Sequence, residues 1–397
     1  MLDTLTTSPS AHKQDSSALS VVSIAHAAVS RSMGRLRYEP LAGRAELDLT
    51  LVVPSRWHEY GRSMVAEAPL PGLRIRTEAI RLPKAGPAKW YLHHYPRFGQ
   101  ILEDAAPDVI HLWEEPWSLV ALQAARWRER HRPDAALVIE TDQNIQRQLP
   151  PPFEQIRRHV LSQTDLLICR TKEALAVSQA CGYRGRSEIV EYGIDTATFH
   201  PQDRAAARAA LGVNGLLLGY VGRLVPEKGL LDVVEGMARS GVEATLLLLG
   251  EGPERDAIQT RAAQLGVAVR FFPPAAPAGV ATFMASLDAL VLMSRTTATW
   301  KEQFGRVIME AHGCGIPVIG SSSGSIPGVV GRGGWIVEEG SADAFGRTLR
   351  RVSLDPNLLL KAGRDGHQDA MERFTYGAVA DGLVRAWQGA SESRCRR

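Results

Sequence analysis

The chain has 397 residues, of which 45% are hydrophobic and 22% charged, so it holds enough apolar side chain for two or three folded domains, and extensive disorder is excluded. The formal net charge of +3 is too small to indicate a nucleic-acid-binding protein. The four cysteines form no C-x-x-C pair or zinc spacing, and no apolar run approaches ~20 residues, which excludes a disulfide scaffold, a zinc knuckle and a membrane-spanning helix.

The N-terminal segment, residues 1–18, is polar and lacks the apolar stretch that a secretory signal needs. We therefore expect a disordered N-terminal tail. Cysteines without pairing motifs are typical of proteins in a reducing compartment. The sequence thus favours a cytoplasmic protein, with the inner face of the membrane as the alternative location.

From residue 19 onward, short β-branched or leucine-rich runs alternate with longer amphipathic segments, which predicts strand–helix–strand units and parallel sheets. Most of these runs are apolar throughout, as is typical of strands covered by helices on both faces. In the first half the expected strands are Val21–Ala25, Leu49–Val53, Arg74–Arg81, Val109–Leu112, Leu137–Glu140, Leu166–Cys169 and Glu188–Glu191. The expected helices there are Ser118–Arg130, Phe153–Leu161 and Lys172–Cys181.

The second half repeats the alternation after an interruption at residues 192–201. We therefore expect an N-terminal domain over residues 19–197 and a C-terminal domain over 198–372, with the helical segment 373–397 as a candidate to cross back to the first domain. The expected strands are Leu216–Val221, Ala244–Leu249, Val269–Phe272, Ala289–Met293, Val318–Gly320 and Trp335–Val337. The expected helices are Gly229–Arg239, Pro253–Leu265, Ala278–Ala285, Phe304–His312, Ala342–Val352 and a final one around Tyr376–Gln388.

The turn after the first strand of the second half carries two cations beside glycines. Gly222 allows a ligand to approach the backbone, Arg223 and Lys228 bring fixed positive charges, and a helix begins near Gly229. This composition suits a diphosphate. An ordinary strand–helix turn with solvated charges is the alternative.

A second motif places Glu302 on a loop and Glu310 on the helix that starts near Gly305. Carboxylates accept paired hydrogen bonds from vicinal hydroxyls, so one of them could hold a sugar and the other a ribose. The alternative is that each is a solvated helix charge. A third motif, Gly250–Glu254, ends a strand and opens a helix with Pro253 in its first position, where the glycines could allow a flat base to lie against the backbone or could form a plain turn.

These motifs, in this order, resemble the retaining glycosyltransferases of family 4, which have the two-domain GT-B fold. The linker adds to the resemblance through Gly193, Asp195 and residues 199–201. The resemblance implies that Arg223 and Lys228 bind the diphosphate of a nucleotide sugar and that Glu302 contacts the transferred sugar. The implied donor-binding residues are Gly222, Gly250, Gly252, Glu254, Phe304, Gly305, Arg306 and, for the ribose, Glu310.

The first half resembles the family more loosely. Where many relatives carry a histidine that faces the donor sugar, this chain has Asp142, which we assign to the catalytic group, although a helix-capping or turn role is an equal alternative. The usual glycine pair after the first strand is also missing, and a cationic residue follows there instead. The predicted acceptor-side residues are Arg31, Glu115, Gln143 and Asn144.

Two other groups of residues have less specific interpretations. The histidines at positions 26, 93, 94 and 111 are scattered along the chain, so each is expected to be a loop or packing residue, and no metal site is predicted. The basic residues within 126–132 and at 157 and 158 are expected to complement helix dipoles, and a peripheral contact with anionic lipid is the alternative.

The sequence therefore predicts a retaining, metal-independent transferase that moves a hexose from a UDP- or GDP-linked sugar to an unidentified glycan, lipid-linked or small-molecule acceptor. It needs no cofactor beyond this co-substrate, and no nucleic acid is expected as a partner. A nucleotide-sugar epimerase of the same fold and a weakly active nucleotide-sugar-binding protein are the alternatives. A dinucleotide-dependent dehydrogenase is disfavoured because no G-x-G-x-x-G follows either opening strand.

Overall fold

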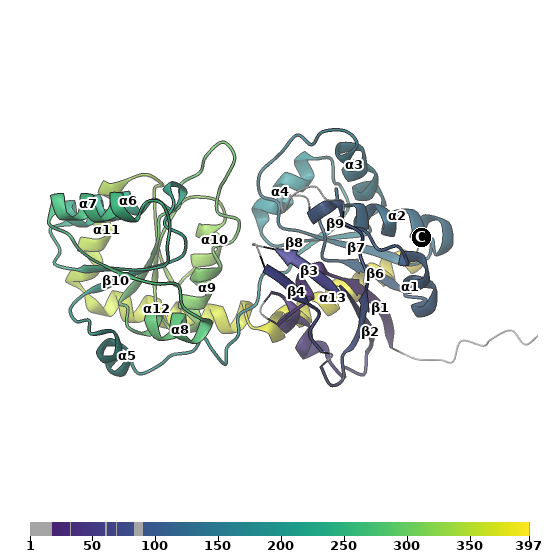
Figure 1. Ribbon diagram of the computed structural model, residues 1–397, viewed down its shortest axis with the longest axis horizontal. Coiled ribbons are helices and arrows are strands. Elements are labelled where there is room, and N and C mark those ends of the chain that lie inside the picture. The colour runs from purple at the N-terminus through teal and green to yellow at the C-terminus, as the bar shows by residue number, and fades with distance from the viewer. Residues whose placement is uncertain (1–17, 32, 60–61, 69, 83–89, 397) are drawn as a thin grey trace, which may run out of the picture.

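The computed structural model describes residues 18–31, 33–59, 62–68, 70–82 and 90–396, which form two α/β domains lying side by side (Figure 1). Each domain contains a parallel sheet flanked by helices. The α/β class and the two doubly wound sheets predicted from the sequence are confirmed. The predicted disordered tail falls almost entirely on residues 1–17, which lie outside the described part of the chain.

The strands of the first domain are β1 (Leu19–Ile24), β2 (Leu47–Pro54), β5 (Arg74–Glu78), β6 (Val109–Leu112), β7 (Ala136–Thr141), β8 (Leu166–Cys169) and β9 (Arg186–Ile189). They form one parallel sheet in the order β5-β2-β1-β6-β7-β8-β9. The helices are α1 (Phe98–Ala105), α2 (Leu119–His131), α3 (Phe153–Gln163) and α4 (Lys172–Ala180). Strands β6, β7 and β8 are buried along their whole length, because packed elements cover both faces of the sheet.

The strands of the second domain are β10 (Leu217–Val221), β11 (Thr245–Leu249), β12 (Ala268–Phe272), β13 (Ala289–Leu292), β14 (Val318–Ser321) and β15 (Gly334–Val337). They form a parallel sheet in the order β12-β11-β10-β13-β14-β15. The helices around it are α5 (Arg204–Leu211), α6 (Leu230–Ser240), α7 (Arg255–Leu265), α8 (Pro277–Ala285), α9 (Arg306–Gly313), α10 (Ile326–Val330), α11 (Ala342–Leu354) and α12 (Pro356–Arg373). The strand order reverses direction at β10, and ligands of doubly wound sheets bind beyond the carboxyl ends of the strands at such a point.

The C-terminal helix α13 (Tyr376–Cys395) leaves the second domain and packs against the sheet of the first, as the yellow ribbon in Figure 1 shows. Its Trp387 is fully buried in the core formed with the 3-10 helix η2 (Arg35–Leu41). The linker lies beside the start of α13, where the Ile194 N–H donates to the Phe374 carbonyl at 2.7 Å. Two chain segments therefore join the domains at neighbouring points. Among the described residues, no helix combines the length and the apolar character that crossing a bilayer would require.

Some predicted boundaries are wrong, and several elements were not predicted. Strand β5 ends at Glu78 and β9 spans Arg186–Ile189, because both lie at sheet edges where polar residues blur the apolar pattern. Pro253 lies in the turn before α7, which begins at Arg255, and not at the first helical position. The elements that were not predicted are the hairpin β3 (Arg56–Glu59) and β4 (Arg62–Val65), the 3-10 helices η1 (His26–Ala28), η2, η3 (Trp90–Leu92) and η4 (Pro226–Lys228), and the helices α1, α5, α10 and α12.

Candidate active site

The turns after β10 and β11 pack directly against each other at the carboxyl edge of the second sheet. Gly222 and Gly250 have φ angles of 149° and 146°, a region that side chains other than glycine rarely adopt. A Cβ on Gly250 would lie 1.9 Å from the Gly222 carbonyl oxygen, so no larger residue fits there. The two predicted donor-binding glycines therefore let the two turns pack closely together, and without side chains they leave the backbone at this edge open to a ligand.

Lys228 and Glu302, which are far apart in the sequence, form an ion pair at this edge. The Lys228 Nζ lies 2.6 Å from Glu302 Oε2, and the Ser294 hydroxyl donates to the same oxygen at 2.9 Å. The ammonium also lies over the ring of Trp300, 4.7 Å from its centroid. Lys228 directly precedes Gly229 and the N-terminus of α6, so the charge of its ammonium group and the positive end of the helix dipole lie at the same edge of the sheet. The structure thus brings together two of the four predicted catalytic residues.

Arg223, the other predicted cation, is exposed. Its guanidinium lies 3.8 Å from Glu227, and the side chain is 72% accessible to solvent. The Arg223 carbonyl accepts a hydrogen bond from the Tyr220 hydroxyl at 2.8 Å, which holds the turn in place. The arrangement leaves the guanidinium able to turn toward an anionic ligand at the same edge as Lys228.

Glu310 lies on α9 and Glu302 on the loop before it. Gly305 caps the helix with a φ angle of 80°, and Phe304 before it is buried. Burial raises the pKa of Glu310 to about 7, with Arg306 acting in the opposite direction. The Glu310 carboxylate forms no hydrogen bond with the part of the chain that the structure describes. A carboxylate that titrates near neutrality without a fixed partner suits reversible binding of hydroxyl groups.

The Gly252–Glu254 turn completes the edge. A Cβ on Gly252 would lie 2.2 Å from the Leu224 carbonyl, and the Glu254 N–H donates to that carbonyl at 3.1 Å. Burial raises the pKa of the Glu254 carboxyl group, whose Oε2 atom is enclosed without a hydrogen bond. The turn therefore presents an under-hydrogen-bonded carboxyl group beside the predicted base-binding glycines.

The predicted residues of the first domain lie at the carboxyl ends of β6 and β7. Glu115 accepts hydrogen bonds from the Thr141 hydroxyl at 2.6 Å and from the Asp142 N–H at 2.9 Å, and burial, assisted by the nearby Asp142 charge, raises its pKa to about 8. The Asp142 carboxylate accepts from Arg170 Nε at 3.1 Å and from the Tyr192 hydroxyl. Both Asp142 oxygens are thus occupied by residues that sequence reasoning did not identify.

Residues predicted from the two halves of the chain meet across the domain boundary. Asn144 Nδ2 donates to the Glu302 carbonyl at 2.8 Å, and Gln303 Nε2 donates to the Asp142 carbonyl at 3.4 Å. The ring of Tyr192, in the linker, packs edge-on against Phe304 at 5.2 Å. The carboxyl edges of both sheets therefore contribute to one site.

Arg31 stands apart from this group. Its guanidinium lies 2.9 Å from Glu39, and its backbone N–H donates to Glu67 at 2.7 Å. Among the described residues it forms no hydrogen bond or ion pair with the other predicted acceptor-side residues. The structure thus places it after the η1 turn, bound to the half-buried Glu39 and the exposed Glu67.

A buried ionic network lies beneath the first edge and was missed by sequence reasoning. Glu140 accepts two hydrogen bonds from Arg37, each at 2.9 Å, and a further one from Arg170, and its Oε1 lies 2.8 Å from His111 Nε2. Both arginines lie over the ring of Trp113. Burial alone would raise the pKa of Glu140, but the two arginines lower it well below its usual value. An acidic residue at the end of an otherwise apolar strand is the signal that could have indicated this network.

The structure also places the two groups of dispersed residues. The histidines are not all isolated, since His26 and His93 meet at Glu114. In the basic segments, Arg128 is buried and donates to Asp165 at 3.2 Å and to the Gln163 carbonyl at 2.9 Å. Arg157 is also buried and pairs with Glu154. These two cations serve internal ion pairs, which removes them from the surface that the alternative, contact with anionic lipid, would need.

Two parallel-sheet domains whose carboxyl edges meet at one site define the GT-B class. The sucrose-phosphate synthase of Thermosynechococcus elongatus matches with a TM-score of 0.68 at 19% identity, covering 94% of this chain and 99% of that one. Anabaena Alr3699/HepE, solved in complex with UDP, matches with a TM-score of 0.69 at 17% identity over 94% of this chain and 100% of the other. The predicted GT-B fold is therefore confirmed.

The family match lies in the second domain, where residues 202–369 fit the model described as "Glycosyl transferases group 1". A D-inositol 3-phosphate glycosyltransferase of Segniliparus rotundus is 29% identical over 259 residues, 61% of this chain and 56% of the relative. One of Mycolicibacterium gilvum is 32% identical over 252 residues, 59% and 55% respectively. The chain thus spans little more than half the length of these curated relatives. Its second domain belongs to the glycosyl transferases group 1, and the predicted resemblance to family 4 is confirmed.

Proposed function

We propose that the chain is a retaining, metal-independent glycosyltransferase that moves a hexose from a UDP- or GDP-linked donor to an acceptor. The observation that carries this proposal is the Lys228–Glu302 pair, seated beside the close-packed glycine turns and joined through Asn144 to the first domain. A cation for a leaving diphosphate and a carboxylate for sugar hydroxyls thus lie at the point where the two domains meet.

The charges explain how this site would work. As the bond to the anomeric carbon lengthens, negative charge develops on the diphosphate and positive charge on the sugar ring. Lys228, the N-terminus of α6 and the exposed guanidinium of Arg223 stabilise the first charge, and the Glu302 carboxylate holds sugar hydroxyls. The acceptor hydroxyl then attacks the face from which the diphosphate leaves and gives its proton to the departing diphosphate oxygen, so the anomeric configuration is kept. Asp142, fixed by Arg170 and Tyr192, is a positioning residue for the acceptor side.

The stereochemistry of the product tests the proposal. UDP-glucose is the first donor to try, because one fold neighbour, Anabaena Alr3699/HepE, was solved with it. Inositol 3-phosphate is the first acceptor, because curated relatives are named for it, and cell extract is the second. We expect release of UDP or GDP and a product whose anomeric proton signal in NMR matches the α-configured donor. An inverted product would contradict the proposed mechanism, and nucleotide binding without any sugar release would contradict an enzymatic role.

Donor affinity should depend on pH through Glu310. The carboxylate must be ionised to accept two ribose hydroxyls, and its pKa in the free protein is about 7. The affinity for UDP-glucose, whose diphosphate does not titrate in this range, is therefore expected to weaken as the pH falls through about 7, approaching a tenfold loss per pH unit. Calorimetry between pH 5.5 and 8.5 measures this. Glu310→Gln should bind more weakly and give a flat profile, whereas a sloping profile in that variant would exclude Glu310 as the titrating group.

A further inference from the structure

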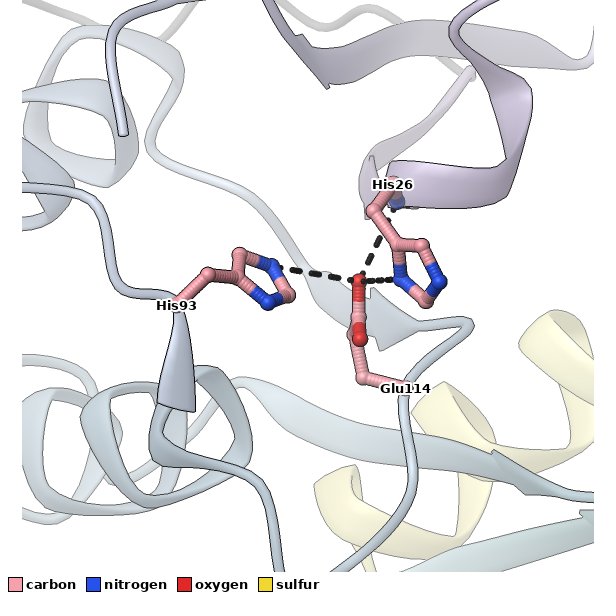
Figure 2. A group of neighbouring side chains, drawn as sticks. All are labelled: His26, His93 and Glu114. Carbon is pink, nitrogen blue, oxygen red and sulfur yellow. Dashed lines mark hydrogen bonds and ion pairs between the residues drawn. The ribbon is translucent and has the colours of Figure 1, made fainter. Parts of the chain in front are cut away.

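Three side chains from separate segments meet at the carboxyl edge of the first sheet (Figure 2). His26 begins the turn η1 after β1, His93 follows η3, and Glu114 follows β6. One ligand atom from each lies within 4.8 Å of the other two. Glu114 and His93 have fully buried side chains, and the His26 side chain is 14% accessible. None of these three residues is among the predicted site residues of the glycosyltransferase.

The hydrogen bonds define the protonation of His93. Its Nδ1 lies 2.7 Å from the Trp90 carbonyl oxygen, and a carbonyl can only accept, so Nδ1 carries the hydrogen. Burial lowers the pKa of His93, which favours the neutral ring. Its Nε2 therefore offers a lone pair, and this atom is enclosed without a hydrogen bond.

That lone pair faces the Glu114 carboxylate, with 3.6 Å between His93 Nε2 and Glu114 Oε1. The second oxygen of this carboxylate, Oε2, is also enclosed without a hydrogen bond. Two electron-pair donors that face each other in a buried place are unfavourable unless a cation is shared between them.

We propose that His26 Nδ1, His93 Nε2 and the Glu114 carboxylate bind a divalent transition-metal ion of the zinc type. Two imidazoles and one carboxylate form an established ligand set for such ions. Ligand atoms that lie 2.0–2.2 Å from a tetrahedral zinc ion are roughly 3.3 Å apart. The present spacings of 2.7 Å from His26 Nδ1 to Glu114 Oε1 and 3.6 Å from His93 Nε2 to the same oxygen bracket that value.

The surroundings supply the outer hydrogen bonds and the walls of this site. Metal-bound histidines usually donate their other ring N–H to a carbonyl or carboxylate, as His93 does to Trp90. The His26 backbone N–H donates to Glu114 Oε1 at 3.1 Å and fixes that oxygen. The ring of Trp57 packs 4.5 Å from that of His26, and the ring of Tyr95 lies 5.8 Å from that of His93. The ion would fasten three segments together next to Glu115, outside the diphosphate-binding edge.

Cobalt(II) substitution tests the proposal on the full chain after dialysis against a chelator. We expect one equivalent of Co²⁺ to give visible d–d absorption bands, with no intense sulfur-to-cobalt band in the near ultraviolet, and Zn²⁺ to displace it. Glu114→Gln keeps the shape of the side chain and should weaken Zn²⁺ binding at least tenfold, as should His93→Ala. His94→Ala, at the neighbouring half-buried histidine, is the matched control and should bind as the wild type does.

Three results would overturn the metal site: no d–d bands in the wild type, unchanged Zn²⁺ affinity in Glu114→Gln, or a sulfur-to-cobalt band that disappears in Cys395→Ser, since Cys395 is exposed. Circular dichroism of metal-free Glu114→Gln checks that the variant is folded; because Glu→Gln is isosteric, a folded variant with lost binding supports the site. UDP-glucose binding, which depends on the second domain, is measured in parallel, so that failure of the metal site and failure of the proposed transfer are distinguishable.

Discussion

Replacing Lys228 with alanine is expected to lower the turnover number for sugar transfer by about 10²–10³-fold, or ~2.7–4 kcal/mol of transition-state stabilisation. The ammonium is half-buried, 2.6 Å from Glu302 and beside the N-terminus of α6. A fixed cation in such a place stabilises charge that grows on the leaving diphosphate more than charge already present in the bound donor. The loss should therefore appear mainly in kcat, with a smaller change in the affinity for UDP-glucose.

The chain offers a matched control for this experiment. Lys361 on α12 pairs with Asp365 at 2.5 Å, but its side chain is 68% exposed and far along the chain from every predicted site residue. Lys361→Ala should leave kcat unchanged, because an exposed lysine–carboxylate pair contributes little. Steady-state kinetics and calorimetry with UDP-glucose measure both variants. Equal kcat values in Lys228→Ala and in the wild type would remove Lys228 from the catalytic group.

The second half of the chain was predictable because its ligand-facing residues lie in short turns directly after apolar strands. Gly222 and Gly250 follow β10 and β11, and their positive φ angles explain why only glycine fits. Glu302 and Lys228 were assigned through the resemblance, and the parallel order of β10 and β13 explains why their loops meet. A local signal and a regular topology were enough here.

The first half was harder to predict because its groupings depend on long-range contacts. His26, His93 and Glu114 belong to three segments separated by dozens of residues, so no short spacing marks them. The resemblance identified Glu115 as a site residue but not its neighbour Glu114. The two carboxylates have different partners, since Glu115 contacts Thr141 and Glu114 contacts His26. Contacts of this kind depend on the order of strands β1, β6 and β7 in the sheet, and no local sequence motif predicts that order.

The ionic network around Glu140 has the same origin and a consequence for stability. Strand β7 places Glu140 where Arg37, from η2, and Arg170, after β8, both reach it. An acid inside a buried strand would be very unfavourable alone, so the sheet depends on cations from two other segments. Arg170 also holds Asp142 and the Val190 carbonyl, which connects the packing of the first domain with the geometry of the proposed site.

We expect Arg170→Met to lower the free energy of unfolding of the first domain by ~3–5 kcal/mol at pH 7, because it leaves the buried Glu140 carboxylate only partly compensated. The matched control is Arg74→Met, which removes an arginine that pairs with Asp48 at 2.8 Å but is 65% exposed; this change should cost about 0–1 kcal/mol. Urea unfolding followed by circular dichroism measures both variants. A cost for Arg170→Met as small as that for Arg74→Met would mean that Arg37 alone compensates Glu140.

The pH dependence of this difference identifies the group responsible. The pKa of Glu140 is lowered in the folded protein, so its ionised form contributes stability that is present above the unfolded pKa of about 4.5 and is lost as the pH falls toward the folded value. In Arg170→Met the pKa of Glu140 in the folded protein moves upward. The folded variant therefore binds a proton at a higher pH than the folded wild type does, and acidification destabilises the variant less. The difference in unfolding free energy between wild type and variant should therefore shrink below about pH 4.5. A difference that stayed constant there would assign the cost to lost packing of the Arg170 side chain over Trp113 and Tyr192.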